Sequence, residues 1–433
     1  MRIFLLGSGG REHALAWKLN QSAPSNSIYI APGNPGTAKC GKNVQLDIRD
    51  FDAIRKFCIY EKIEMVIVGP EEPLVNGLYD YFKASEELQN IHFIGPSKEG
   101  AKLEGSKAFA KAFMKRHNIP TSKYREFTSD NYEEGIKYLQ QHDLPIVLKA
   151  DGLAAGKGVV ICQSYVEAIA EFELMIQQAK FGEASKKVVV EDFLSGIEVS
   201  VFAITDGKNY VMLPEAKDYK RIGEGDKGLM TGGMGAVSPV PFAKDDFMRK
   251  VEERIIRPTV NGIYKEGIEY TGFIFFGLIN VNGDPYVIEY NCRMGDPETE
   301  VVIPRLENDL VEICIAASGK ELDKVQVRVD KRAAATIMAA SRGYPTGFEK
   351  GFEITGLDEK YGKQSIVFQA GTKEEDGKIL TNGGRVFCVT SFGEDIEDAV
   401  SSSLEVLNNI HFEGIYYRTD IGYEFKPSAS PQM

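Results

Sequence analysis

The chain has 433 residues, 43% of them hydrophobic, which predicts about two to four domains with buried cores and excludes disorder as the main state. Its 63 Asp and Glu residues outnumber its 51 Lys and Arg residues, and the net charge of −12 disfavours a general nucleic-acid-binding protein because such a chain repels phosphate backbones. No stretch reaches the roughly 18 apolar residues of a membrane span and the six cysteines form no C-x-x-C, so we expect a reduced, cytoplasmic protein with neither a membrane nor a nucleic-acid partner.

Residues 1–104 alternate short apolar runs with amphipathic stretches, which is the pattern of a parallel sheet with crossover helices. The first apolar run is followed at once by glycines and charges, so it predicts a strand and not a signal peptide. Glycine and proline follow the strands, and ligand loops belong at the carboxyl ends of parallel strands. The expected strands are residues 2–6, 27–30, 65–68 and 92–94, and the expected helices are residues 12–19, 52–61 and 75–84.

The pattern changes at Ser106, which precedes an expected helix that Pro120 stops. A strand-rich stretch follows, and then a loop-rich region over residues 206–271 with one amphipathic helix near residues 247–265. Asn282-Gly283 between two apolar runs predicts a hairpin. The expected strands are residues 146–149, 158–161, 188–191, 198–204, 272–281 and 286–289, with a helix at residues 165–178.

The tail from about Val325 predicts a separate small α+β domain. Its expected elements are strands at residues 334–339, 365–369 and 385–390 and a helix at residues 396–408. The fold class that the whole pattern predicts is therefore a multidomain α/β and α+β protein.

The segment GSGGRE at residues 7–12 lies between an expected strand and an expected helix, where glycines let backbone N–H groups approach a phosphate. It half matches the dinucleotide-binding fingerprint, but Glu12 stands where the third glycine belongs, and Pro-Gly-Asn follows the second strand in place of an acidic residue. NAD binding is therefore disfavoured, and a sugar phosphate held by Gly9, Gly10 and Arg11 fits better. A tight turn with a solvated arginine is the alternative.

The segment DGLAAGKGV at residues 151–159 differs from a P-loop, which needs four residues between its glycines and Ser or Thr after its lysine. What remains is a cationic loop of small residues, with Gly156, Lys157 and Gly158 at its centre, suited to closing over a triphosphate. Lys149, on the strand before the loop, is expected to project towards the same phosphates. A glycine-rich turn with one solvated lysine is the alternative.

The sharpest motif lies at residues 285–298, PYVIEYNCRMGDPE. Residues two apart on a strand share a face, so Glu289 and Asn291 present hard oxygen ligands that suit Mg²⁺ bridging nucleotide phosphates. Arg293 follows on that face and can hold a phosphoryl oxygen or a carboxylate. The alternative is an edge strand with alternating polar residues, which the apolar facing positions Ile288 and Tyr290 disfavour.

Two further segments carry weaker signals. Residues 191–198, EDFLSGIE, connect two expected strands, and such a hinge offers backbone groups to a base edge and a carboxylate to ribose hydroxyls. Residues 218–221, DYKR, form a charged loop before the glycines of TGGMG at residues 231–235, which can lie close to a ligand. A plain surface connection and a solvated charge cluster are the respective alternatives.

The chain resembles the ATP-grasp superfamily and, within it, the phosphoribosylamine–glycine ligase (glycinamide ribonucleotide synthetase) family in these segments, in order: GSGGREHALAWKL, APGNPGT, VGPEEPL, IGPSKEGAKLEGSKAF, LKADGLAAGKGV, VEDFLSGIEVS, KDYKR, TGGMGAVSP and NCRMGDPETE. The resemblance covers essentially the whole chain. It implies an N-terminal parallel α/β substrate-binding domain at residues 1–104, an ATP-grasp domain at 105–324 with a mobile lid at about 122–194, and a C-terminal α+β domain at 325–433.

The resemblance also implies a role for each matching residue. The implied ATP-binding residues are Lys107, Lys149, Gly156, Lys157, Gly158, Glu191, Phe193 and Glu198. The implied ligands of Mg²⁺ or Mn²⁺ are Glu289 and Asn291. The implied substrate-binding residues are Gly10, Arg11 and Glu71 on the amine side and Asp218, Lys220 and Arg293 on the glycine side. The residues implied in the chemistry are Lys149, Arg293 and Asp218.

The chain departs from the pattern of this superfamily in two places. Many members have an acidic metal ligand on the strand before Glu289, where this chain has Phe-Phe-Gly-Leu at residues 275–278, so the metal site has fewer carboxylates. Many relatives have Gln-Asp-His-Lys-Arg where residues 217–221 read Lys-Asp-Tyr-Lys-Arg, so no histidine there can act as a base.

The activity that the resemblance implies is ATP-dependent ligation of glycine to 5-phosphoribosylamine through a glycyl phosphate, giving glycinamide ribonucleotide, ADP and phosphate in purine biosynthesis. The sequence offers no histidine metal spacing and no G-x-S-x-G, so it supports neither a zinc site nor a hydrolytic nucleophile. Three rivals stay open: another ATP-grasp carboxylate–amine ligase or carboxylase, a dinucleotide oxidoreductase, and an inactive nucleotide-binding regulator. We expect a monomer or a weak dimer.

Overall fold

The N-terminal part is a parallel sheet in the order β3-β2-β1-β4-β5, covered by helices on both faces. The computed structural model describes residues 1–152, 158–178, 180, 182, 187–357 and 361–425. Strands β1 and β4 are buried almost throughout, as parallel strands between two helical layers must be. The strands are β1 (Arg2–Gly7), β2 (Ser27–Pro32), β3 (Lys42–Asn43), β4 (Met65–Val68) and β5 (His92–Pro96). The helices are α1 (Gly10–Leu19), α2 (Phe51–Glu61), α3 (Glu71–Val75), α4 (Leu78–Ala84) and α5 (Lys98–Gly105).

The central sheet continues directly from this parallel sheet through one long strand. The first residues of β16 (Tyr270–Val281) pair with β5, and the rest of β16 pairs with β10 (Ile197–Thr205) and β17 (Asp284–Asn291). Asn282 and Gly283 form the predicted hairpin turn with positive φ angles of 52° and 89°. Alternate residues of β16 contribute to two separate cores, so this sheet is buried on both faces.

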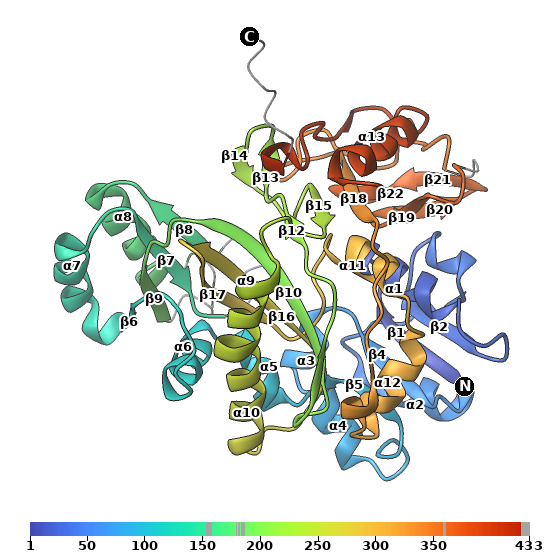
Figure 1. Cartoon of the computed structure of the whole chain (residues 1–433), viewed down its shortest axis with the longest axis horizontal. Coiled ribbons are helices and arrows are strands. Elements are labelled where there is room, and N and C mark those ends of the chain that lie inside the picture. Colours follow the sequence, from blue (N-terminus) through green and yellow to red (C-terminus); the bar gives the residue numbers. More distant parts are fainter. Residues whose placement is uncertain (153–157, 179, 181, 183–186, 358–360, 426–433) are drawn as a thin grey trace.

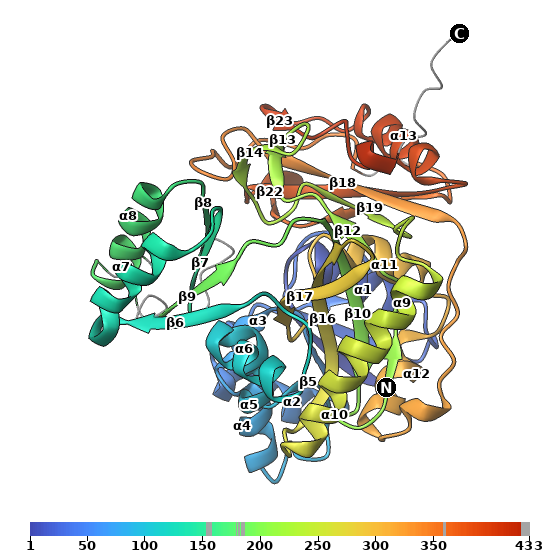
Figure 2. The same cartoon turned by 60° about the vertical axis from the view of Figure 1, so that its left-hand side comes forward.

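Helices cover the two faces of the central sheet (Figure 1, Figure 2). The first face packs against a long helical stretch made of α9 (Asp245–Val251), a π-helical turn at Glu252–Ile256 and α10 (Arg257–Lys265). The other face packs against α11 (Thr299–Arg305) and α12 (Leu310–Ser318). No helix of the part that the structure describes is long and apolar enough to cross a membrane.

A four-stranded antiparallel sheet forms a lid that projects away from the body (Figure 1). Its strand order is β6-β9-β7-β8, and its own core contains Phe127, Phe172 and Val190. Helix α6 (Lys107–Arg116) leads into it. The lid elements are β6 (Tyr124–Thr128), α7 (Tyr132–Gln141), β7 (Ile146–Ala150), β8 (Val159–Cys162), α8 (Tyr165–Ile176) and β9 (Lys187–Asp192).

The C-terminal sheet recruits two strands from the middle of the chain, in the order β12-β15-β18-β22-β19 with β23 beside β18. It lies above the central sheet in Figure 1 and is covered by α13 (Ile396–Leu407). Its strands are β12 (Lys217–Asp218), β15 (Gly235–Ser238), β18 (Ala333–Ser341), β19 (Ser365–Gln369), β22 (Arg385–Gly393) and β23 (Ile415–Tyr416). Two hairpins flank it, β13 (Arg221–Gly223) with β14 (Lys227–Met230) and β20 (Thr372–Glu375) with β21 (Lys378–Thr381).

Two local predictions are wrong. The expected helix at residues 75–84 is two helices, α3 and α4, because Gly77 adopts a positive φ of 91° between them. The expected loop over residues 206–271 contains five short strands, including β11 (Tyr210–Met212). β11 pairs with the preceding β10, β13 pairs with β14, and β12 pairs with β15, which also pairs with the distant β18. The bulge in β17 has no sequence signal: the pairing of β16 with β17 shifts between Gly277 and Leu278 and leaves Ile288 as an extra residue.

Candidate active site

Two lysines contact one buried glutamate where the lid joins the core, and a third lysine lies near them; we call Lys107, Lys111, Lys149 and Glu191 the lysine cluster. Glu191 Oε1 lies 3.0 Å from Lys149 Nζ, and its Oε2 lies 2.9 Å from Lys111 Nζ. Burial alone raises the pKa of Glu191, but the two ammonium groups outweigh burial and hold that pKa below its usual range. Burial lowers the pKa of Lys111 to about 8 even with Glu191 beside it. The cluster has two positive charges in excess and suits a polyanion.

Lys149 also explains the extra residue in β17. Its Nζ donates to the carbonyl oxygen of Ile288 at 3.1 Å, the residue that the register shift leaves without a strand partner. Lys149 is thereby held between Glu191 of β9 and Ile288 of β17, and its orientation towards phosphates stays a prediction. Bulges of this kind occur next to active sites because they redirect a neighbouring side chain.

Lys107 connects α6 to the glycine-rich loop. Its Nζ donates to the carbonyl oxygen of Gly152 at 2.9 Å, while Asp151 accepts from Ser106 Oγ and from the Ala108 amide at the start of α6. Burial and the charge of Lys149 lower the pKa of Lys107, and Glu289 opposes them. Gly158 is buried at the end of the loop, whereas Gly156 and Lys157 lie outside the described residues.

The hinge predicted at residues 191–198 is present between β9 and β10. Phe193 is 41% exposed on it, which leaves its ring available to a flat ligand. Glu198, at the start of β10, forms an ion pair with Lys220, and this contact lowers the pKa of Glu198. Lys220 Nζ also lies 3.3 Å from Asp218 Oδ1. The sequence-predicted hinge and charged loop are therefore one connected site, and the alternative of a solvated cluster is wrong because Asp218 is buried.

Glu289 and Asn291 point to the same side of β17, as predicted. In the part of the chain that the structure describes, neither side chain forms a hydrogen bond or a salt bridge with protein, and no group of three or more His, Cys, Asp or Glu side chains could hold a metal. Gly277 lies opposite Glu289, and a Cβ there would come within 2.9 Å of Glu289 Cγ. Two free hard oxygen donors fit a divalent cation whose remaining ligands are phosphate oxygens and water.

Two arginines meet three glutamates between the N-terminal part and the core, and we call Arg11, Glu12, Glu71, Glu104 and Arg293 the arginine–glutamate cluster. Arg293 Nη2 lies 2.8 Å from Glu104 Oε1, and its Nε lies 3.3 Å from Glu71 Oε2. Arg11 Nε lies 2.6 Å from Glu12 Oε1. Arg11 is only 8% exposed, so the alternative of a solvated arginine is wrong. Burial raises the pKa of Glu104, whereas Arg293 and Arg11 outweigh burial at Glu71 and lower its pKa.

Arg385 of the C-terminal part contacts Gly232 and Asp296, which lie outside that part. Its Nη1 donates to the carbonyl oxygens of Gly232 and Asp296 at 2.7 and 2.9 Å, and its Nη2 lies 2.9 Å from Asp296 Oδ1. The fully buried Glu300 faces Gly10, whose lack of a side chain leaves room for it, and neither carboxyl oxygen of Glu300 has a hydrogen-bond partner. Burial raises the pKa of Glu300 far above its usual range.

Glu298 lies near Asp218. It is buried, and its Oε1 accepts a hydrogen bond from Ser200 Oγ at 3.1 Å. Burial and the nearby charge of Asp218 raise the pKa of Glu298 to about 7, and burial also raises the pKa of Asp218. A carboxyl group with such a pKa changes its charge near neutral pH and can exchange protons there.

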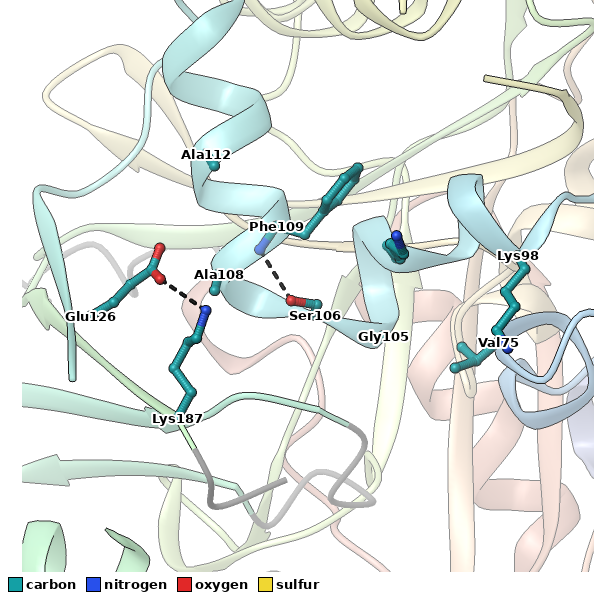
Figure 3. A pocket seen from close by; sticks show the side chains of 10 residues that line it. Val75, Lys98, Gly105, Ser106, Ala108, Phe109, Ala112, Glu126 and Lys187 are labelled. Atoms are coloured by element: carbon teal, nitrogen blue, oxygen red, sulfur yellow. Dashed lines mark hydrogen bonds and ion pairs between the residues drawn. The ribbon is translucent and has the colours of Figure 1, made fainter. Parts of the chain in front are cut away.

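A hollow of about 490 Å³ lies beside this site, between α5, α6 and the lid (Figure 3). Figure 3 shows Lys187 of β9 paired with Glu126 of β6 on one side, and Ser106 accepting from the Phe109 amide at the start of α6. Its lining contains none of the sequence-predicted site residues. The predicted residues that the structure describes lie instead on or next to α1, α3, α6, β7, β8, β9, β10, β12 and β17.

Known proteins share this arrangement along the full chain. Family models match in order: "Phosphoribosylglycinamide synthetase, N domain" at residues 1–104, its "ATP-grasp (A) domain" at 105–299 and its "C domain" at 334–424. The phosphoribosylamine–glycine ligase of Haemophilus influenzae is 46% identical over 426 residues, covering 98% of each chain. That of Clostridium acetobutylicum is 43% identical over 422 residues, covering 98% of this chain and 99% of the other. This chain belongs to the phosphoribosylglycinamide synthetase family.

Solved structures agree with this membership of the phosphoribosylglycinamide synthetase family. A phosphoribosylamine–glycine ligase from Thermotoga maritima is 36% identical, has a TM-score of 0.83, and is matched over 97% of this chain and 100% of that one. A biotin carboxylase from Campylobacter jejuni shares the fold, with a TM-score of 0.71 at 16% identity over 98% of this chain and 94% of that one. The predicted family, the multidomain fold class and the ATP-dependent ligase class are confirmed, and the rival of a dinucleotide oxidoreductase is wrong.

Several residues of this site are not predictable from the sequence pattern. Lys111 follows Lys107 by four positions on a predicted helix, a spacing that places both on one helix face and could have drawn attention to it. Asp296 and Glu298 lie inside the segment that carried the resemblance, yet no local pattern distinguishes their contacts. Glu104 and Arg385 had no signal at all, because their partners lie far away in the sequence.

Proposed function

We propose that this chain joins glycine to 5-phosphoribosylamine with cleavage of ATP to ADP and phosphate, giving glycinamide ribonucleotide. The observation that carries the proposal is the presence, in a chain of this family, of two neighbouring clusters of opposite excess charge near Glu289 and Asn291. The lysine cluster suits a triphosphate, and the arginine–glutamate cluster suits an amine-bearing sugar phosphate.

On the nucleotide side, Lys107 and Lys149 contact the phosphates, and the loop at residues 151–159, with Gly156, Lys157 and Gly158, covers them. The hinge with Glu191 and Phe193 holds the base, and Glu198 accepts from the ribose hydroxyls. The half-exposed ring of Phe193 and the position of Glu198 at the start of β10 support these roles. Because the three ammonium groups are already in place, little rearrangement is needed as charge develops on the transferred phosphoryl group.

Glu289 and Asn291 would hold the divalent cation, Mg²⁺ or Mn²⁺, and the cation when bound neutralises charge on the phosphate oxygens. Gly277 supports this role, since it leaves the space that the Glu289 side chain occupies. The same two oxygen donors suit either ion. The choice between Mg²⁺ and Mn²⁺ would therefore depend on which ion is more available and on the preference of Mg²⁺ for octahedral coordination.

Glycine lies between Arg293 and the pair of Asp218 and Lys220. A carboxylate oxygen of glycine attacks the γ-phosphorus of ATP, the bond to the β-phosphate oxygen breaks, and glycyl phosphate forms. The amine of phosphoribosylamine, held by Gly10, Arg11 and Glu71, then attacks the glycyl carbonyl carbon and phosphate leaves. Arg293 and Lys149 stabilise the negative charge at each step, so no covalent protein nucleophile is needed.

The division at residues 104/105 and 324/325, a monomeric or weakly dimeric state and a cytoplasmic location stay predictions. The pairing of β5 with β16 joins the N-terminal sheet to the central sheet. It supports treating these two sheets as one rigid unit, relative to which the lid at residues 122–194 moves.

The test is product analysis by mass spectrometry with glycine, phosphoribosylamine and MgATP. We expect glycinamide ribonucleotide with ADP released in equal amount, and no ADP release when either acceptor substrate is omitted. The variant Glu289→Ala should lose activity, with part of it restored by raised Mn²⁺. ADP release that depends on a different acceptor, such as bicarbonate, would assign the chain to another ATP-grasp activity.

A further inference from the structure

Residues 217–220 present alternate side chains to two different environments. Lys217 and Tyr219 face the C-terminal part, where Tyr219 is 1% exposed and belongs to the C-terminal core. Asp218 and Lys220 face the opposite way, towards Glu198 and Glu298. The backbone pairs with β15 at residues 217 and 218 and continues through two hydrogen bonds at Tyr219. Fixing the odd-numbered side chains therefore fixes the direction of the even-numbered ones.

Glu424 binds both odd-numbered side chains at once. Its Oε1 lies 2.8 Å from Lys217 Nζ, and its Oε2 accepts from the Tyr219 hydroxyl at 2.9 Å. Lys217 Nζ also lies 4.0 Å from the centre of the Tyr219 ring, and the Arg418 guanidinium lies 5.3 Å from that ring on the same C-terminal segment. Burial, with Glu424 beside the hydroxyl, raises the pKa of Tyr219 far above its usual range, so the phenol stays a donor.

The rest of the same C-terminal segment holds the hairpin that follows Lys220. Arg418 is fully buried, donates to the carbonyl oxygen of Arg221 at 3.1 Å, and lies 2.7 Å from both Asp226 Oδ1 and Asp420 Oδ1. Asp420 in turn accepts from the Gly225 amide at 2.7 Å. The segment thus contacts residues 217–226 along their whole length, immediately beside Asp218.

We propose that Glu424 is a positioning residue for substrate binding: through Lys217 and Tyr219 it holds Asp218 and Lys220 in the orientation that receives glycine. The inference rests on the proposed function, because that function gives Asp218 and Lys220 their substrate. It adds a part of the C-terminal domain to the glycine subsite without any contact between Glu424 and glycine. A carboxylate that accepts from both Lys217 and Tyr219 is well suited to this role, because its removal leaves both side chains without this partner.

The experiment measures KM for each substrate and kcat in the full-length Glu424→Ala variant. We expect KM for glycine to rise about tenfold, because a small misplacement of a binding group has effects of this order or more. We expect KM for phosphoribosylamine and kcat at saturating glycine to stay within about twofold, because the residues that hold the sugar amine lie on other elements. Tyr219→Phe removes one of the two contacts and should raise KM for glycine by a smaller factor.

Two variants separate positioning from a general loss of structure. Lys217→Gln keeps a neutral donor for Glu424 and should retain a KM for glycine near that of the unaltered chain. Glu413→Ala, an exposed glutamate of the same C-terminal part, serves as the matched control. An unchanged KM for glycine in Glu424→Ala, or an equal change in all three kinetic constants, overturns the inference. Failure of the unaltered chain to form glycinamide ribonucleotide overturns the proposed function instead, and the two results are distinguishable in the same assay.

Discussion

The lysine cluster has three ammonium groups and one carboxylate, which contacts two of them, whereas the arginine–glutamate cluster has three carboxylates and two guanidinium groups. The first cluster comes from α6, β7 and β9, which lie within about 85 residues of one another in a single family domain. The second brings Arg293 together with Glu71 and Glu104 from the N-terminal part. Opposite excess charge on neighbouring clusters lets one site bind a triphosphate and an amine without attracting both to the same place.

The largest expected effect comes from removing the central cation of the lysine cluster. Lys149→Met takes away the ammonium group beside Glu191 and the donor to Ile288, and we expect kcat to fall about 10³-fold because preorganised charge at the transferred phosphoryl group is lost. Steady-state ADP release measures this effect. Lys187→Met is the matched control, a lysine on β9 whose partly exposed pair with Glu126 is worth less than about 1 kcal/mol. Equal losses in both variants would refute the special role of Lys149.

The next effect tests how much the contacts of Arg385 with Gly232 and Asp296 contribute to the docking of the C-terminal part on the rest of the chain. Arg385→Lys loses the forked contacts to Gly232 and Asp296, and we expect about 3 kcal/mol less free energy of unfolding because two charge-assisted hydrogen bonds disappear. Denaturant unfolding provides the measurement, with Arg249→Lys on the exposed face of α9 as control. An unaltered midpoint in Arg385→Lys would show that the C-terminal part docks without this contact.

A pH-dependent effect follows from Glu298. Its pKa of about 7 in the folded chain lies above the ordinary value of 4.5, so the folded state binds more protons than the unfolded state between these values. This group's stabilising contribution is therefore complete at low pH and disappears as pH rises through about 7, a loss of about 2 kcal/mol between pH 5 and 8. Glu298→Gln should remove that loss and gain stability relative to the unaltered chain at pH 8.

The readout for Glu298 is the difference between the two unfolding curves at each pH, because other groups titrate over the same range. Burial lowers the pKa of His13 to about 4, so His13 acts with the opposite sign, costing stability as pH falls. The difference cancels His13, which both chains share. A pH-independent difference would mean that Glu298 is ionised throughout. Glu405→Gln, on the exposed surface, is the control.

The smallest expected effect concerns the proposed metal site at Glu289 and Asn291. Gly277→Ala places a methyl group within 2.9 Å of Glu289 Cγ, and we expect the Mg²⁺ concentration for half-maximal activity to rise about tenfold, since displacing a ligand's support weakens metal sites by this order. Gly347→Ala, where a Cβ meets open space, is the matched control. An unchanged Mg²⁺ requirement would argue that Glu289 moves aside without cost.

The sequence by itself determined the parallel N-terminal sheet and the hairpin at Asn282-Gly283. It also identified three candidate ligand-binding segments: the glycine-rich loop at residues 151–159, β17, and the GSGGRE turn at residues 7–12. These features depend on local periodicity, turn chemistry and short spacings, which a single segment contains in full. The family resemblance added roles for residues such as Lys107, Phe193 and Glu71, whose local surroundings carry no signal of their own.

Only the tertiary structure decided which charges meet. Four features depend on strand register or on chain segments that lie far apart in the sequence. They are the extra residue Ile288 in β17, the contact of Arg11 with the Met294 carbonyl, the contact of Arg293 with Glu104, and the contact of Glu424 with Lys217. Electrostatic and pairing energies depend on distance in space, and the sequence fixes that distance only through the complete packing of the fold.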